Sequence, residues 1–324
     1  MKSYIYCIFS LCAVSALAIG GAALAQDYPT KPIRLVVPFP PGGGTDFMAR
    51  VIMQKVGEGI NGTVVVENRG GAGSSIGTDL VAKSPADGYT LLVVSGAHAI
   101  NPSIYPKLPY DSVRDFSPVT MFVSGPQLLV VHPSVPVKTV KELIALAKSR
   151  PGQINYASAG TGTPPHLAGE LFKTMAHVNI VHVPYKGNGT AYVDLIGGHV
   201  SVMFPNVSTA TAHVRAGRLR ALAVTTKART SVAPELPTIS ESGVPGYEVS
   251  SWYGLLAPAG TPTAIVTRLQ REVAKVMHAP DVAEKLTSQG LDIVGSTPDE
   301  FAALIKTEIA KWAKVAKASG ARAD

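Results

Sequence analysis

Short apolar segments alternate with amphipathic stretches of helical spacing along nearly the whole chain. The run Ile33–Pro38 predicts a strand that ends in a glycine-rich turn, and Met48, Val51, Ile52 and Val56 then share one face of a helix. The same order of strand, turn and helix recurs further along. Such alternation with short connections predicts an α/β fold with largely parallel sheets.

The same pattern predicts further strands at residues 63–67, 91–95, 128–131, 154–157, 180–183, 200–204, 221–225 and 252–257. Helices are expected over 75–83 and from Pro164. Thr139 and Glu142 form a capping box, which predicts another helix start. Pro262 and Pro298 each follow a threonine, a pattern that places proline at the first helical position, so two long helices are expected to close the chain.

The first 25 residues have the features of an export signal. Lys2 is the only charged residue before Asp27, Ile5–Ala18 is an apolar run, and Ala23-Leu24-Ala25 has the small-x-small pattern of a signal-peptidase site. A retained membrane anchor is the alternative, but the run is short against the about 20 residues that span a bilayer. The sequence therefore predicts a leader, residues 1–25, that is cleaved to give a periplasmic protein.

Both cysteines, Cys7 and Cys12, lie inside this leader, without a convincing lipoprotein motif. The mature chain from Gln26 thus has no disulfide and depends on hydrophobic cores. Removing Lys2 and no acid lowers the formal charge from +7 to +6. The remaining basic residues are scattered, which argues against a nucleic-acid or membrane partner, although a mild positive field favours an anionic solute.

Two glycine-rich loops, Pro38–Asp46 and Ser158–His166, each follow a predicted strand and open a predicted helix. Glycine lets backbone N–H groups approach a ligand, and the first N–H groups of a helix lack intrahelical partners and carry partial positive charge. One such loop alone is typical of an ordinary connection. Two in one exported chain predict a two-sided site for an anion such as a carboxylate, with further donors from the hydroxyls of Thr45, Ser158, Thr161 and Thr163.

Other readings of these glycines fit less well. The chain has no Gly-x4-Gly-Lys-Ser/Thr string, and neither loop has the Gly-x-Gly-x-x-Gly spacing of a dinucleotide site, so no nucleotide cofactor is expected. Gly73–Gly77 matches the Gly-x-Ser-x-Gly string of hydrolases, but five residues separate its first glycine from the predicted strand. A secreted hydrolase that uses Ser75 as nucleophile is therefore an alternative hypothesis, and a helix-start serine is favoured.

The eight histidines show no metal-binding spacing, so no metal is expected. His166 differs from the others because it lies one turn into the helix that the second glycine-rich loop opens. It is therefore a candidate for lining the site.

Short strings from almost the entire mature chain resemble the Bug family, the extracytoplasmic receptors of tripartite tricarboxylate transporters. The order and spacing of these strings together carry the resemblance; they are Tyr28–Arg34, Val37–Asp46, Glu67–Gly73, Asp87–Leu91, Asn101–Tyr105, Tyr156–Leu167, Val183–Gly187, Trp252–Gly254 and Ala257–Pro262. One departure is that Ser74 and Ser75 stand where glycine or asparagine is more usual.

The resemblance implies a two-lobed periplasmic-binding-protein fold, the Venus flytrap, with the ligand cleft between the lobes. One lobe is expected to combine residues 26–125 and 226–324, and the other to contain 126–225. The protein is then a non-enzymatic receptor, expected to be a monomer, that passes a dicarboxylate, tricarboxylate, acidic amino acid or aromatic acid to inner-membrane transporter subunits. A sensor that docks on a membrane signalling protein is a further alternative.

The resemblance also implies which residues bind the ligand. The carboxylate clamp is expected from Phe39 and Gly42–Asp46 (Gly42, Gly43, Gly44, Thr45, Asp46) in one lobe. The other lobe is expected to supply Ser158–Thr163 (Ser158, Ala159, Gly160, Thr161, Gly162, Thr163) and His166. The third loop adds Tyr185 and Lys186, and the candidates for ligand selection are Ser95, Gly96, His98, Asn101 and Asn206.

Overall fold

The computed structural model describes residues 28–323. The leader predicted at residues 1–25 lies outside these residues. The strands are β1 (Ile33–Val37), β2 (Val64–Asn68), β3 (Thr90–Ser95), β4 (Phe116–Pro126), β5 (Leu128–Val131), β6 (Asn155–Ser158), β7 (Val181–Pro184), β8 (Val202–Met203), β9 (Arg220–Val224), β10 (Ser250–Pro258) and β11 (Asp292–Ile293).

The α-helices are α3 (Gly44–Met48), α4 (Gln54–Gly59), α5 (Ser75–Ala82), α6 (Ala97–Ile104), α7 (Val140–Ser149), α8 (Pro164–Ala176), α9 (Asn188–Ile196), α10 (Val207–Arg215), α11 (Thr263–Met277), α12 (Pro280–Thr287) and α13 (Pro298–Ser319). A π-helical turn, η1 (Ala49–Met53), joins α3 to α4, and a short 3-10 turn, η2 (Ala72–Ser74), precedes α5. None of the described helices has the length and apolar character needed to cross a bilayer.

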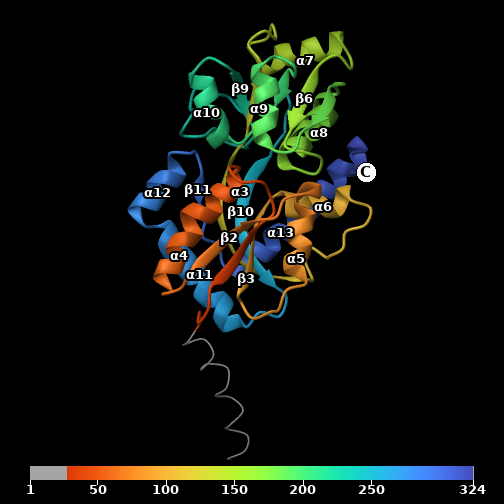
Figure 1. The fold of residues 1–324 in the computed structure, drawn as a ribbon. Coiled ribbons are helices and arrows are strands. Elements are labelled where there is room, and N and C mark those ends of the chain that lie inside the picture. The colour runs from red at the N-terminus through yellow and green to blue at the C-terminus, as the bar shows by residue number, and fades with distance from the viewer. Residues whose placement is uncertain (1–27, 324) are drawn as a thin grey trace, which may run out of the picture.

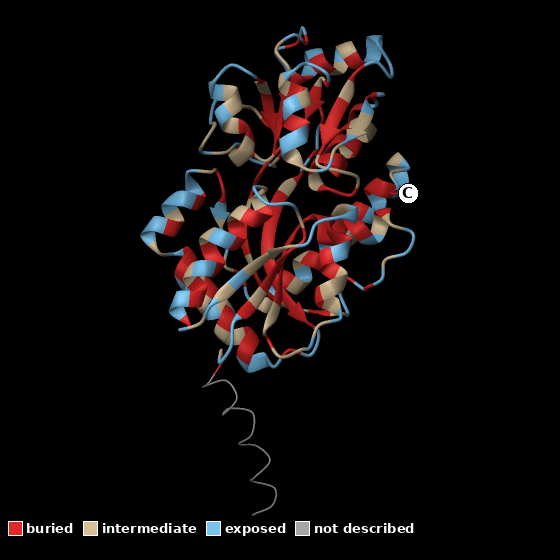
Figure 2. Cartoon of the chain, viewed as in Figure 1, coloured by how far each residue is buried: buried red, intermediate tan, exposed pale blue. Residues whose placement is uncertain are grey.

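Two sheets form two lobes, one below and one above in Figure 1. The lower sheet has the strand order β11-β4-β10-β3-β1-β2, and the upper sheet has the order β7-β6-β8-β5-β9. The inner strands of both sheets consist mainly of buried apolar residues, while the outward faces of the helices are exposed (Figure 2). The structure therefore confirms the predicted two-lobed α/β architecture.

The sheets are mixed, and the prediction of largely parallel sheets was wrong. The pairs β1–β2, β1–β3, β6–β7 and β6–β8 are parallel, whereas β10 pairs antiparallel with β3 and β4, and β5 pairs antiparallel with β8 and β9. The cause is the path of the chain. It leaves the lower lobe through β4 and returns through β10 beside it, so these two long strands run in opposite directions.

The two passages between lobes lie side by side. The first is at Gln127, between β4 and β5, close to the expected position. The second differs from the expectation near residue 226, because the chain re-enters the lower sheet only at Ser250. Residues 226–249 stay with the upper lobe, where the N–H of Val249 bonds the carbonyl of Thr225 (2.8 Å) and the Tyr247 hydroxyl bonds the carbonyl of Ala168 (2.9 Å).

Local capping rules succeed at two helices and fail at one. The capping boxes at Thr139 and Thr297 are both formed, each with its glutamate three residues on. Pro262, by contrast, is the N-cap of α11 rather than its first residue. The last helix, α13, packs against α6 and β4 in the lower lobe and against α8 in the upper lobe.

The interior glycine of α8 gives a test of the packing. A Cβ on Gly169 would lie 2.3 Å from the ring of Tyr156, whereas a Cβ on Gly189, in the first turn of α9, has no atom within 4 Å. Alanine normally stabilises a helix relative to glycine. We expect Gly169→Ala to lower the free energy of unfolding by about 1–3 kcal/mol because the ring must move. Gly189→Ala should leave it unchanged or slightly raised, and urea denaturation of both variants checks this; equal effects would contradict it.

Candidate functional site

A cavity of about 460 Å³ lies where the two lobes meet. Its walls come from the loops that precede α3, α8, α9 and α10 and from strand β10. Of the predicted site residues, the lining contains Phe39, Gly42, Gly43, Gly44, Thr45, Ser95, Ala159, Thr163, Lys186 and Asn206. The structure therefore brings together residues from all three predicted loops.

Asp46 supports the first loop instead of lining the cavity. Its side chain is buried and accepts hydrogen bonds from the N–H of Gly42 (3.0 Å), from Asn68 Nδ2 (3.0 Å) and from Arg50 Nε (3.1 Å). Burial alone raises the pKa of Asp46, but these bonds from Arg50, Gly42 and Asn68 hold it below its usual range. The carboxylate thus fixes the turn that opens α3, and its charge is compensated by Arg50.

The start of α3 presents donors to the cavity. The first intrahelical bond runs from the N–H of Phe47 to the carbonyl of Gly43 (2.9 Å). The N–H groups of the first turn, on Gly44 and Thr45, therefore have no partner within the helix. Both residues line the cavity, so an anion there meets unpaired N–H groups and the positive end of a helix dipole.

A polar chain links α3 to the upper lobe. The Tyr253 hydroxyl sits over Gly44, where a Cβ would be only 2.2 Å from its oxygen. It accepts a hydrogen bond from Asn206 Nδ2 (2.7 Å), and Asn206 Oδ1 accepts one from Ser251 Oγ (2.6 Å). Gln127 Nε2 in turn donates to Ser251 Oγ (3.1 Å). Burial raises the pKa of Tyr253 to about 12, partly offset by Asn206, so the phenol stays protonated at neutral pH.

The second loop differs from its expected role as a source of helix-start donors. Pro164 and Pro165 occupy the first two positions of α8, and proline has no N–H group. The next N–H, on His166, turns back to the carbonyl of Thr163 (3.0 Å). This helix start therefore offers the cavity two apolar rings, together with Ala159 and Thr163.

The glycines of the second loop use their N–H groups internally. The N–H of Gly160 donates to Ser158 Oγ (3.1 Å), and the N–H of Gly162 donates to His166 Nδ1 (3.2 Å). Gly160, Thr161 and Gly162 do not line the cavity. Gly162 instead faces the lower lobe, where a Cβ would lie 3.0 Å from Asn101 Oδ1.

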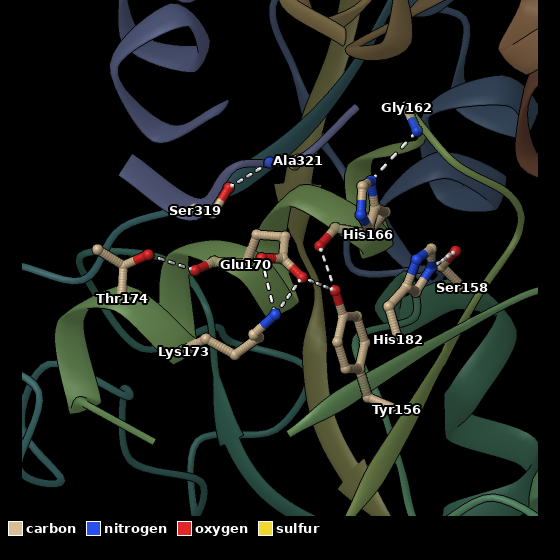
Figure 3. A network of polar contacts seen from close by, with 10 residues as sticks. All are labelled: Tyr156, Ser158, Gly162, His166, Glu170, Lys173, Thr174, His182, Ser319 and Ala321. Carbon is tan, nitrogen blue, oxygen red and sulfur yellow. Dashed lines mark hydrogen bonds and ion pairs between the residues drawn. The ribbon is translucent and has the colours of Figure 1, made fainter. Parts of the chain in front are cut away.

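Ser158 and His166 belong to a buried network behind this loop, shown in Figure 3. The His166 ring stacks on His182 at a centroid distance of 4.0 Å, and His182 Nε2 lies 2.6 Å from Ser158 Oγ. Deeper in the network, the Tyr156 hydroxyl donates to Glu170 Oε1 (2.6 Å). Ser158 and His166 therefore hold the loop in place and do not touch the cavity.

The imidazoles of this network are neutral. Burial lowers the pKa of His166 to about 4, helped by the positive charge of Lys173. Burial lowers that of His182 to about 3, and His166 adds to the effect. Neutral His166 can accept from Gly162 through Nδ1, which the protonated ring cannot do.

The third loop brings a lysine and another helix start to the cavity. Lys186 lines the wall, whereas Tyr185 turns away and donates its hydroxyl to Asp194 Oδ2 (2.6 Å). Residues 187–190 continue the wall into the first turn of α9. This segment was not predicted, although a glycine after a strand and before a helix, the signal used for the first two loops, was present there.

Other lining residues were also missed. Among those that the prediction left out are Pro40, Pro41, Pro164, Pro165, Gly187, Asn188, Gly189, Thr190, Ser251, Trp252 and Tyr253. The prolines stand inside the very strings that predicted the two glycine-rich loops. Trp252 and Tyr253 come from β10. Tyr253 pairs there with Ser95, the last residue of β3, which was a candidate for ligand selection and lines the cavity.

His98, another candidate for ligand selection, lies in the core. It is 1% exposed, and its Nε2–H donates to the carbonyl of Ser112 (2.8 Å). Its ring stacks on Tyr110 and meets Phe116 edge-on. His98 therefore has a structural role. The sequence could not distinguish this role from a ligand-facing one, because a position just after β3 is compatible with either.

The hydrolase alternative has no geometric support. Ser75 is the first residue of α5 and is buried, and β2 ends seven residues earlier at Asn68. A nucleophile elbow needs the serine on a sharp turn directly after a strand. Within residues 28–323, no group of three histidine, cysteine or acidic side chains is placed to hold a metal ion.

Two α/β lobes with a cavity between them, walled by helix starts, define a solute-binding receptor of the periplasmic type. Comparison with known proteins gives its family. The chain belongs to the tripartite tricarboxylate transporter receptor family, TctC, whose model matches residues 48–321. The resemblance to the Bug family is thereby confirmed, and with it a carboxylate-binding extracytoplasmic receptor that is not an enzyme.

Individual relatives cover almost the entire chain. Protein BugT of Bordetella pertussis is 40% identical over 311 residues, 95% of each chain. The structure of R. palustris Rpa4515 with adipate has a TM-score of 0.87 at 42% identity, covering 91% of this chain and 99% of its own. MatC (Rpa3494) from Rhodopseudomonas palustris with bound malate has a TM-score of 0.84 at 32% identity, covering 89% and 99%.

Buried His98 should make folding sensitive to acid. Burial lowers its pKa to about 4, against about 6.5 in the unfolded chain. Between these pKa values the unfolded state binds more protons than the folded state does. The part of the free energy of unfolding that depends on neutral His98 is therefore complete above about pH 6.5 and is lost as the pH falls to about 4. The difference is worth up to about 3 kcal/mol.

We expect His98→Gln, which keeps a donor for Ser112, to remove this share of the acid sensitivity. The measurement is urea denaturation at pH 7 and at pH 4.5, with His278→Gln at an exposed histidine as the control for residue type. His98→Gln should lose less stability on acidification than the unmodified protein does. Identical losses would show that His98 does not carry the effect.

Proposed function

We propose that this protein captures a small organic carboxylate between its lobes and delivers it to the inner-membrane subunits of a tripartite tricarboxylate transporter. The observation that carries the proposal is the cavity lined by the starts of α3, α9 and α10. First-turn residues of α3 and α9 and the N-cap residue of α10 line one space, and the positive ends of helices there favour an anion.

Two relatives support a small acid as the ligand, since one was solved with adipate and the other with bound malate. In this chain the proposed contacts are the predicted residues that line the cavity, extended by the start of α9 and by β10. They are Phe39, Gly42–Thr45, Ser95, Ala159, Thr163, Lys186, Asn188–Thr190, Asn206, Ser251, Trp252 and Tyr253. Asp46, Ser158, His166 and Tyr185 act behind them, through the hydrogen bonds described above.

Export is part of the proposal. The leader of residues 1–25 is removed after Ala25, and the mature monomer works in the periplasm. One lobe then combines residues 28–126 with 250–323, and the other contains 127–249, consistent with the strand pairings of the two sheets.

Ligand capture predicts stabilisation by an acid. Screening the purified mature protein against organic acids should raise the Tm with at least one of them, because a ligand that binds only the folded state stabilises it by linkage, about 2.7 kcal/mol at 100 times Kd. Calorimetry then gives the affinity. Mass spectrometry of denatured protein detects an acid that co-purified. No shift across a broad panel, together with no co-purified acid, would exclude the proposal.

Two neighbouring glycines give a matched test of the site. Gly44→Ala places a Cβ 2.2 Å from the Tyr253 hydroxyl, whereas a Cβ on Gly43 has as its nearest neighbour the carbonyl of Pro40, at 3.9 Å. We expect Gly44→Ala to weaken acid binding about tenfold or more, since it displaces Tyr253 from Asn206, and Gly43→Ala to weaken it less than threefold. Calorimetry on folded variants measures both.

Tyr253→Phe in the Gly44→Ala background removes the oxygen that the new methyl group meets. Binding should then recover in part. Equal binding by Gly43→Ala and Gly44→Ala would contradict a ligand site at the start of α3.

A further inference from the structure

A second hollow, of about 430 Å³, lies in the upper lobe. Its walls include the last turn of α10, strand β9 and the segment 232–236, and we call it the α10 groove. It shares no lining residue with the cavity between the lobes. The α10 groove is therefore a separate feature of the surface, which ligand capture does not use.

Most of the side chains that line the α10 groove are apolar. They include the buried residues Leu128 and Leu219 and three partly exposed residues that pack against the core of this lobe, Val214, Val232 and Leu236. Among the described lining residues, the only hydroxyl is that of Thr211, which donates to the carbonyl of Val207 (2.7 Å). Partly exposed apolar side chains that meet in one hollow are typical of a site that a partner covers.

Arginine gives the α10 groove a positive charge. Arg215 and Arg220 line it, and Arg218, in the turn between them, is exposed. Arg220 Nη1 donates to the carbonyls of Val135 (3.2 Å) and Val137 (2.8 Å), which fixes its guanidinium group. Among the described residues, no carboxylate forms an ion pair with any of these three arginines. Their charges are therefore available to an acidic partner.

The arginines are part of a charge difference between the lobes. Residues 127–249 contain eleven lysines and arginines against six acids, a formal charge of +5, whereas the chain from Gln26 onward carries +6. Glu235, the single acid among the described lining residues of the α10 groove, leaves the arginines in excess. A partner that complements this surface is therefore acidic and carries apolar side chains.

Helix α10 connects the groove to the ligand cavity. Its N-cap, Asn206, lines the cavity, whereas Val214 and Arg215 in its last turn line the groove. The groove also borders the other lobe, because a Cβ on Gly290 would lie 2.6 Å from Val232. Figure 1 shows α10 above α12, the helix that precedes Gly290. A partner in the groove thus contacts both the helix that begins at the cavity and a wall that packs on the lower lobe.

We infer that the α10 groove is the docking surface for an acidic segment, with apolar side chains, of an inner-membrane subunit of the transporter. The inference rests on the proposed function, which requires delivery of the acid to such a subunit but assigns no surface to it. The groove fits this occupant because it is basic, partly apolar, separate from the bound acid and in contact with both lobes.

The test separates ligand binding from delivery. Arg215→Glu reverses a charge of the groove, and Val214→Ser removes an apolar side chain from it. Arg150→Glu, at an exposed residue that ends α7 in the same lobe, lies outside the groove and controls for residue type and net charge. Calorimetry with the acid that the Tm screen identifies measures ligand affinity.

Delivery is measured as uptake of the same acid, radiolabelled, into right-side-out membrane vesicles. The vesicles come from cells that lack the receptor gene and retain the inner-membrane subunits, and purified mature receptor is added to them. The measured quantity is the receptor concentration that gives the half-maximal rate of uptake. The Tm of each variant is measured as well; since Arg215 and Arg150 are exposed, their substitution should leave it unchanged, which excludes misfolding as a cause.

All three variants should bind the acid within about twofold of the unmodified protein, because none of the three residues lines the cavity. We expect Arg215→Glu to raise the half-maximal receptor concentration about tenfold or more, the effect of losing an arginine hot spot, and Val214→Ser to raise it about threefold. Arg150→Glu should change it less than about twofold. A rise in NaCl from about 50 to 300 mM should raise this concentration for the unmodified receptor, and less for Arg215→Glu, because salt screens attraction between opposite charges.

Equal uptake with Arg215→Glu and Arg150→Glu would overturn docking at the α10 groove, while capture and delivery of the acid would stand. Uptake that does not depend on salt would overturn an acidic partner. If no acid binds, or if the unmodified receptor supports no uptake, the proposed function fails and the inference fails with it.

Two other occupants of the groove would also be recognised. Sedimentation of the receptor with protein-free vesicles of phosphatidylglycerol and phosphatidylcholine, lost in Arg215→Glu, would assign the groove to an anionic lipid surface. A dimer in solution that Arg215→Glu dissociates would assign it to a second copy of the chain. Either result would overturn the inference.

Discussion

The hydrogen bond from Asn206 to the Tyr253 hydroxyl is the contact on which the site depends. It joins the N-cap of α10 in one lobe to the central strand β10 of the other, directly over Gly44. Asn206 also accepts a hydrogen bond from Ser251. Ser251 accepts one from Gln127, which lies at the first passage between the lobes. Ser251 and Asn206, in the middle of this chain, each have a hydrogen-bond partner on either side, so the chain links the two lobes beside the cavity.

Local pattern predicted most strands, the capping box at Thr139, the helix start at Pro298 and the loops that precede α3 and α8. These features follow from short-range rules, hydrophobic period and helix-start chemistry, which act within a few residues. The sheet directions did not follow, because β4 and β10 are neighbours in space and over 120 residues apart in sequence. The late return at Ser250 was missed for the same reason: Tyr247 and Val249 are held by contacts to the upper lobe that no local signal records.

The candidate site was predictable as a set of loops but not as a set of contacts. Glycine content identified residues 42–45 correctly as cavity wall, yet gave the same expectation for residues 158–163, where only Ala159 and Thr163 reach the cavity. The difference lies in hydrogen bonding. The N–H groups of Gly160 and Gly162 donate to Ser158 and His166. Whether such a loop directs its N–H groups at the cavity or at its own side chains depends on residues of other strands, such as His182.

Contacts on two sides of the lobe junction hold the lobes together. On one side α13 packs on α8, and one apolar cluster extends from Leu92 in β3 through Trp312 to Phe172 in α8. Separating the lobes there would expose hydrocarbon to water, at about 25 cal/mol per Å². On the other side the Asn206 amide bonds the Tyr253 hydroxyl, and a Cβ on Gly290 would lie 2.8 Å from Val207 of α10, so this side combines a hydrogen bond with apolar packing. Both kinds of contact therefore hold the lobes together around the cavity.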